Sequence, residues 1–169
     1  MIESGLYEWV TANPNIQPLL GNVDAQRVQP FKAFYFSFYP KGAPLPGIVL
    51  DRLQSQNESE TLDAGSRLPG QMIEARFQFG SLANFTGDGA QAIPGGPESP
   101  SGYLAAAALS LALKRELQEL ANGRSALPDG TIINDVRIED EYDAHYEVGG
   151  TGYMLRRVLA VTIIYTEAS

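Results

Sequence analysis

Residues 71–80 read Gln-Met-Ile-Glu-Ala-Arg-Phe-Gln-Phe-Gly, and their apolar side chains alternate with polar ones. The apolar set is Ile73, Ala75, Phe77 and Phe79, and the polar set is Glu74, Arg76 and Gln78. A period of two places successive side chains on opposite sides of a pleated strand. The stretch therefore predicts a half-buried antiparallel strand.

A second strand is expected just before it, over residues 48–53 (Ile-Val-Leu-Asp-Arg-Leu). Pro44 and Pro46 confine its start to a strand entry or a sheet edge, because proline cannot donate to the ladder. The connection between the two strands, Gln54–Gly70, is polar and far longer than a hairpin requires. Loops of this length in compact domains usually contact something or are disordered.

Two helices are expected from apolar residues at helical spacing. A short N-terminal helix carries Ile2, Leu6, Trp9 and Val10 on one stripe, and Asn13-Pro14 ends it. A longer helix, Tyr103–Asn122, repeats Ala106, Leu109, Leu113, Leu117 and Leu120 at intervals of three or four residues. The segment Ser81–Gly102, which precedes the longer helix, is rich in glycine and proline, and we predict a flexible loop there.

The C-terminal part predicts two further strands. Val136 and Ile138 alternate with charged residues in the first, Thr131–Glu139, and the acidic residues that follow are expected at the strand end, beside a turn. The last strand, Tyr153–Tyr165, is apolar on both faces, which is typical of a central strand. Together these patterns predict an α+β domain, with a mainly antiparallel sheet and the two helices packed on one face.

Composition predicts one soluble globular domain over residues 1–169, with long loops at 54–70 and 81–102. The chain has 169 residues, 44% hydrophobic content, a net charge of −8 and no cysteine, which excludes disulfides and thiolate metal sites. No apolar run approaches the roughly 20 residues of a membrane helix. The start lacks the basic region of a secretion signal, so an intracellular protein is expected. Adjacent basic residues are few, so we expect no sequence-specific nucleic-acid binding.

The candidate site residues are the acidic run Glu139, Asp140, Glu141 and Asp143. Carboxylates could coordinate a hard cation, but the run lacks the spacing of the familiar calcium loop. The segment from Glu116 to Glu147 has nine acidic residues and two basic ones, which predicts a strongly negative end of the molecule. The lone histidine, His145, cannot anchor a multi-histidine metal site, and we expect a surface or turn position for it.

Several short motifs, in their order along the chain, resemble the phage tail-completion, or tail-terminator, protein family. They are Pro44-Leu45-Pro46, Thr61-Leu62-Asp63, Glu74-Ala75-Arg76-Phe77-Gln78-Phe79, Tyr142-Asp143, and Tyr153-Met154-Leu155-Arg156-Arg157 after the glycine-rich turn. The resemblance covers nearly the whole chain. It implies a structural protein without enzymatic activity or cofactor, found in the virion tail and assembled in the host cytoplasm.

The resemblance further implies the partners: other copies of the chain in a ring, taken as a hexamer, the tail tube protein that the ring caps, and the head-side connector protein. No membrane partner is expected. The acidic run would then face the ring lumen or a neighbouring protein. Two alternatives stay open from the residues alone. One is a small hydrolase with paired carboxylates, and the other is a monomeric ligand-binding module that uses the aromatic cluster at residues 31–39.

Overall fold

The computed structural model describes residues 1–23, 31–40, 45–53, 71–86, 102–123, 125–148 and 152–167. The elements are α1 (Ile2–Ala12), the 3-10 helix η1 (Gln17–Leu19), β1 (Asn22–Val23), β2 (Phe31–Lys32), β3 (Phe34–Phe36), β4 (Gly47–Leu53), β5 (Met72–Thr86), α3 (Gly102–Asn122), β6 (Ile132–Val148) and β7 (Gly152–Thr166). A five-stranded sheet has the order β3-β4-β5-β7-β6, and β1 pairs with β2 separately. The β3–β4 pair is parallel and the other pairs in the five-stranded sheet are antiparallel, so the α+β class is confirmed.

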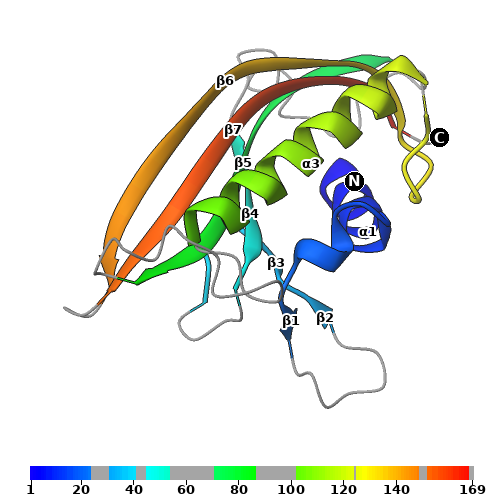
Figure 1. The fold of residues 1–169 in the computed structure, drawn as a ribbon. Coiled ribbons are helices and arrows are strands. Elements are labelled where there is room, and N and C mark those ends of the chain that lie inside the picture. The colour runs from blue at the N-terminus through cyan, green and yellow to red at the C-terminus, as the bar shows by residue number, and fades with distance from the viewer. Residues whose placement is uncertain are drawn as a thin grey trace.

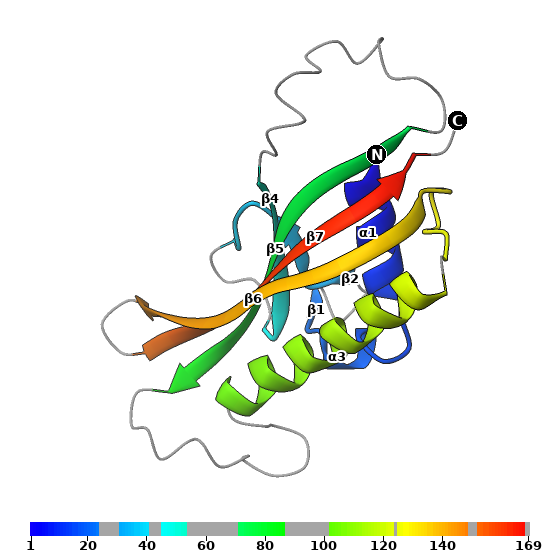
Figure 2. The ribbon, with the colours of Figure 1, turned by 90° about the horizontal axis from the view of Figure 1, so that it is seen from above.

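Strand β7 lies at the centre of the long strands, between β5 and β6, as its apolar sequence predicts. Figure 2 shows β5, β7 and β6 side by side along their length. Leu159 and Val161 are buried on one face of β7, and Val158 and Thr162 are buried on the other. A strand that buries both faces gains little from polar residues, which explains why this is the most apolar stretch of the chain.

The main core lies between the sheet and the two helices. It joins Ile2, Leu6 and Val10 of α1 and Leu109, Leu113 and Leu117 of α3 to Phe77, Phe79, Leu159, Val161 and Ile163 of the sheet. Strands β5, β6 and β7 all contact α3. Figure 1 shows both helices on the concave side of the arching strands. The alternation at residues 73–79 is realised as predicted, with Phe77 and Phe79 buried and Arg76 exposed.

The predicted loop Ser81–Gly102 is wrong at both ends. Residues 81–86 extend β5, where they pair with residues 152–157 of β7, and Gly102 already belongs to α3. Ser81, Leu82 and Ala83 are buried. The long β7 offers a hydrogen-bonding partner for these residues, and that tertiary pairing outweighs their weak local strand signal. The part of this loop at 87–101, and all of the predicted loop Gln54–Gly70, lie outside the described residues.

The placement of the acidic run beside a turn is also wrong. Strand β6 does not stop at Glu139 but continues to Val148, with register shifts between Ile133 and Asp135 and between Ile138 and Asp140. The run therefore lies inside a strand: Asp140 is opposite Ala160, and Asp143 is opposite Arg157. Since β6 is the edge strand of the sheet, its side chains reach water easily, and charged residues are common on such edges.

The N-terminal predictions agree with the structure. Helix α1 ends at Ala12, before Asn13-Pro14, as predicted. Residues Phe34–Phe36 of the aromatic cluster form β3, the other edge of the sheet. Strand β4 begins directly after Pro46, which is a strand entry as expected. Within the described ranges, no helix is long and apolar enough to cross a membrane.

The orientation of α3 predicts the effect of two leucine substitutions. Leu113 is fully buried, so Leu113→Ala should lower the free energy of unfolding by about 2–5 kcal/mol through lost contacts and a cavity. Leu111 is 46% exposed, so Leu111→Ala should change it by less than about 0.5 kcal/mol. Urea unfolding followed by circular dichroism measures both values, and equal losses would contradict the orientation.

Candidate functional site

The predicted acidic residues are divided between the two faces of β6. Glu141 is only 26% exposed and lies on the helix side, where Arg157 donates to its Oε1 at 3.0 Å and Lys114 to its Oε2 at 3.4 Å. The Ser110 hydroxyl also donates to Oε1, at 3.4 Å. Asp143 lies 3.7 Å from the same Arg157. These two carboxylates therefore meet positive charge from α3 and β7.

Glu139 and Asp140 are both exposed. Asp140 accepts a hydrogen bond from the backbone N–H of Glu141 at 2.8 Å, and the Asp140 carboxylate stays exposed to solvent. The four predicted residues are adjacent in the sequence, but in the structure they do not form one negative surface, because Glu141 and Asp143 lie beside Arg157. Glu139 and Asp140 remain as candidates for a lumen or partner contact. Glu141 helps to hold α3 to the sheet through Ser110 and Lys114, whereas Asp143 contacts Arg157 of the neighbouring strand.

No group of three or more histidine, cysteine or carboxylate side chains within the described ranges is arranged to hold a metal ion. His145 pairs with Leu155 in the β6–β7 ladder, and its side chain lies outside the described part of the chain.

A pocket of about 440 Å³ opens between α1 and the strands β3 and β4. Its lining residues are Met1, Glu3, Ser4, Tyr7, Phe36, Ser37, Leu50 and Arg52. Phe34 and Phe36 meet edge to face, with ring centroids 5.5 Å apart, and Tyr7 packs against both rings. The walls of the pocket are therefore formed by aromatic side chains of β3 and by residues in the first two turns of α1.

The polar side of the pocket is an ion pair that links three elements. Arg52 Nη1 of β4 donates to Glu3 Oε1 of α1 at 2.6 Å, and Nη2 donates to the Tyr165 hydroxyl of β7 at 3.2 Å. The guanidinium carbon lies 5.7 Å from the centre of the Phe77 ring, which is within the range of a cation–π contact. Glu3 is 17% exposed and Arg52 28% exposed, so water screens the pair only in part.

Burial and hydrogen bonding act on these groups in opposite directions. Burial alone lowers the pKa of Arg52, but its hydrogen bonds to Glu3 and Tyr165 outweigh this effect, and the net pKa is raised. Burial raises the pKa of Tyr165. Both groups therefore keep their ordinary protonation states at neutral pH, a charged guanidinium and a neutral phenol. Neither Arg52 nor Tyr165 is poised to accept a proton, and the contacts of Arg52 with Glu3 and Tyr165 anchor α1, β4 and β7 to one another.

The pocket suits the binding of an apolar group better than catalysis. Its walls are apolar and aromatic, and the Arg52 charge is balanced by Glu3. A hydrolase with paired carboxylates would need two acids, and Glu3 is the one carboxylate among the described residues that line this pocket. Sequence reasoning did not single out Glu3 or Arg52. The charged Arg52 after the apolar run Ile48–Leu50 was the available signal, because a charge on a half-buried strand needs a partner.

No protein-family model matches the chain, and no curated protein matches it. The resemblance to tail-terminator proteins therefore stays a prediction from the residues.

The division of the acidic run predicts unequal effects of removing its charges. Glu141→Gln should lower the free energy of unfolding by about 1 kcal/mol, because Arg157 and Lys114 lose a partly buried partner. Glu139→Gln should change it by less than about 0.5 kcal/mol, since Glu139 is exposed. Urea unfolding at neutral pH compares the two variants. A larger loss for Glu139→Gln would contradict the placement of these side chains.

Proposed function

We propose that the chain is a virion structural protein, a subunit of an oligomeric ring that ends the tail tube and meets the head-side connector. The proposal starts from the ordered motifs that resemble the tail-terminator family. The observation that carries it is the apolar surface at the mouth of the pocket. Met1 is 79% exposed there and Phe36 43%, and Phe38, two residues beyond Phe36, is 71% exposed.

Exposed apolar side chains that gather in one place mark interaction sites more often than isolated ones do. A small domain with a complete core has no internal use for such a surface, and contact with neighbouring subunits would cover it. The net charge of −8 agrees with a protein that lies near DNA without binding it, because binding to the phosphate backbone needs clustered cations.

A ligand-binding module is the second candidate, because Phe36 of the aromatic cluster lines the pocket. A volume of about 440 Å³ is within the range of small-molecule sites. A monomer that binds a small apolar ligand would favour this candidate over the ring.

Ring formation predicts the mass of the protein in solution. Light scattering at several concentrations should give a multiple of 18.3 kDa, or a mass that rises with concentration. The same measurement is repeated with tail tubes present, so that a ring that needs the tube as a template is also detected. A strict 18.3 kDa species in both conditions would contradict the proposal.

The exposed acids predict a second result. If Glu139 and Asp140 face the lumen, the double variant Glu139→Gln/Asp140→Asn should assemble normally and retain more non-specific DNA at low salt, because less negative charge repels the backbone. If they contact a neighbouring tail protein, the same variant should attach more weakly to the tail and retain no more DNA.

The control is Glu74→Gln/Glu119→Gln, which removes the same number of charges from β5 and α3. DNA retention that rises equally in the control would assign the effect to net charge and not to the acidic run. If neither DNA retention nor attachment to the tail changes, Glu139 and Asp140 are ordinary solvated residues without a role in either contact.

A further inference from the structure

The solvent side of α3 is apolar in its first half. Exposed residues recur there at intervals of three or four, at Leu104, Ala108, Leu111, Arg115, Gln118 and Asn122, and Glu119 beside Gln118 is exposed as well. Leu104 is 40% exposed and Leu111 46% exposed, although the opposite side of the helix already fills the core. A surface helix normally carries polar residues on this side. We call the residues Leu104, Ala108 and Leu111 the α3 stripe.

The pocket beside α1 has the properties that an exposed leucine requires. Tyr7, Phe36 and Leu50 supply apolar walls, and the Glu3–Arg52 pair has no net charge. An apolar side chain that enters the pocket therefore covers aromatic surface and meets no uncompensated ion. A negatively charged occupant would lose its hydration and meet the Glu3 carboxylate, which already neutralises Arg52.

The charges beside the two surfaces are complementary. Arg115 follows Leu111 by one helical turn and is exposed. Glu8 follows Ser4, a residue of the pocket lining, by one helical turn on α1 and is also exposed. Residues four apart are neighbours on a helix surface. When α3 of one copy runs in the same direction as α1 of the next, a leucine beside Ser4 brings Arg115 of its own helix close to Glu8.

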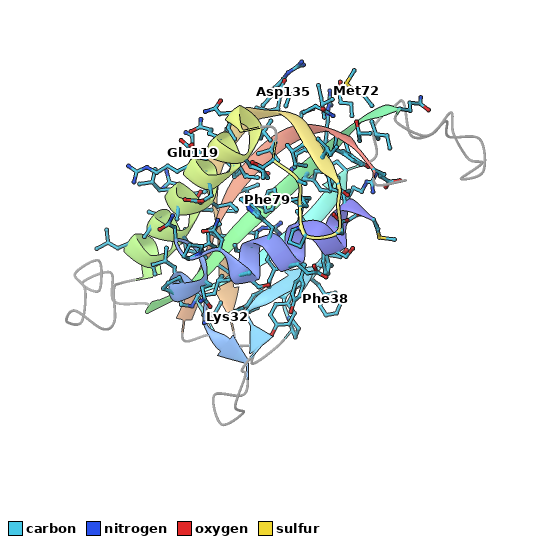
Figure 3. All side chains as sticks on the ribbon, turned by 90° about the vertical axis from the view of Figure 1, so that its right-hand side faces the viewer. Lys32, Phe38, Met72, Phe79, Glu119 and Asp135 are labelled. Atoms are coloured by element: carbon cyan, nitrogen blue, oxygen red, sulfur yellow. The ribbon has the colours of Figure 1, made fainter. Side chains whose placement is uncertain are left out.

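The two surfaces cannot meet within one molecule. Figure 3 shows α3, marked by Glu119, and the β3 end, marked by Phe38, on opposite sides with α1 between them. The geometry points to a contact between copies, in which the α3 stripe of one subunit enters the pocket of the next and Arg115 pairs with Glu8. This inference rests on the proposed ring. It assigns the ring a head-to-tail contact, the type that closes into rings.

The test uses one blocking variant for each surface. Leu111→Glu places a charge on the stripe, and Ser4→Arg fills the pocket mouth and repels Arg115. Both positions are on helix surfaces, so both variants should keep the wild-type urea midpoint. Each variant alone should weaken self-association roughly thirtyfold or more, as the loss of a central interface contact does. Asn122→Glu, farther along the same side of α3, is the matched control and should assemble as the wild type does.

Mixing the two variants identifies the contact. The Leu111→Glu subunit keeps an intact pocket, and the Ser4→Arg subunit keeps an intact stripe. A one-to-one mixture should therefore form a heterodimer of twice the 18.3 kDa mass and grow no further. Glu8→Arg and Arg115→Glu should each weaken assembly, and the double variant Glu8→Arg/Arg115→Glu should restore it.

Wild-type assembly by Leu111→Glu and Ser4→Arg would overturn the contact, and so would a mixture that stays monomeric. If Leu111→Glu and Ser4→Arg assemble as the wild type does and still end tail tubes, the proposed function is kept and only the proposed contact is rejected. If the heterodimer forms but the wild type has no effect on tail tubes, the contact stands and the function fails.

Discussion

One buried face of the sheet governs the rest of this structure. Phe77 and Phe79 of β5 and Leu159 and Val161 of β7 form an apolar layer that α3 covers with Leu109, Leu113 and Leu117. Burial of this layer is the main gain in free energy on folding, because apolar area removed from water stabilises at roughly 25 cal/mol per Å². Because Leu109, Leu113 and Leu117 of α3 face this layer, the opposite side of the helix, which carries Leu104 and Leu111 in its first half, faces solvent.

The pocket follows from the same layer. Helix α1 completes the core through Ile2, Leu6 and Val10, and its first turn is tied to the sheet by the Glu3–Arg52–Tyr165 contacts. The ion pair sets how close α1 lies to β4, so the opening beside Ser4 and Tyr7 is a consequence of how the helix is anchored. Arg52, on the strand next to the β3 edge, thus shapes a surface feature without acting as a reactive group.

The sequence predicted the elements whose periodicity comes from this layer. The alternation at residues 73–79, the leucines of α3 and the doubly apolar β7 all report burial directly, and each was placed correctly. The extension of β5 to Thr86 and of β6 to Val148 was not predicted. Those residues form strands because they pair with β7, and that tertiary pairing is not visible in the local sequence.

The division of the acidic run was not predicted for the same reason. Glu141 and Asp143 were predicted at a strand end beside a turn, whereas the alternation of the continued strand directs both side chains toward Arg157. The pocket joins residues far apart in the chain, so no local pattern could locate it.

The central claim is that the chain forms a ring that ends a tail tube, and electron cryo-microscopy of tail tubes incubated with the purified protein tests it most directly. The account predicts a ring of density at one end of each tube and tubes that stop growing once it has bound. Bare tube ends, or protein scattered along the tube walls, would contradict it.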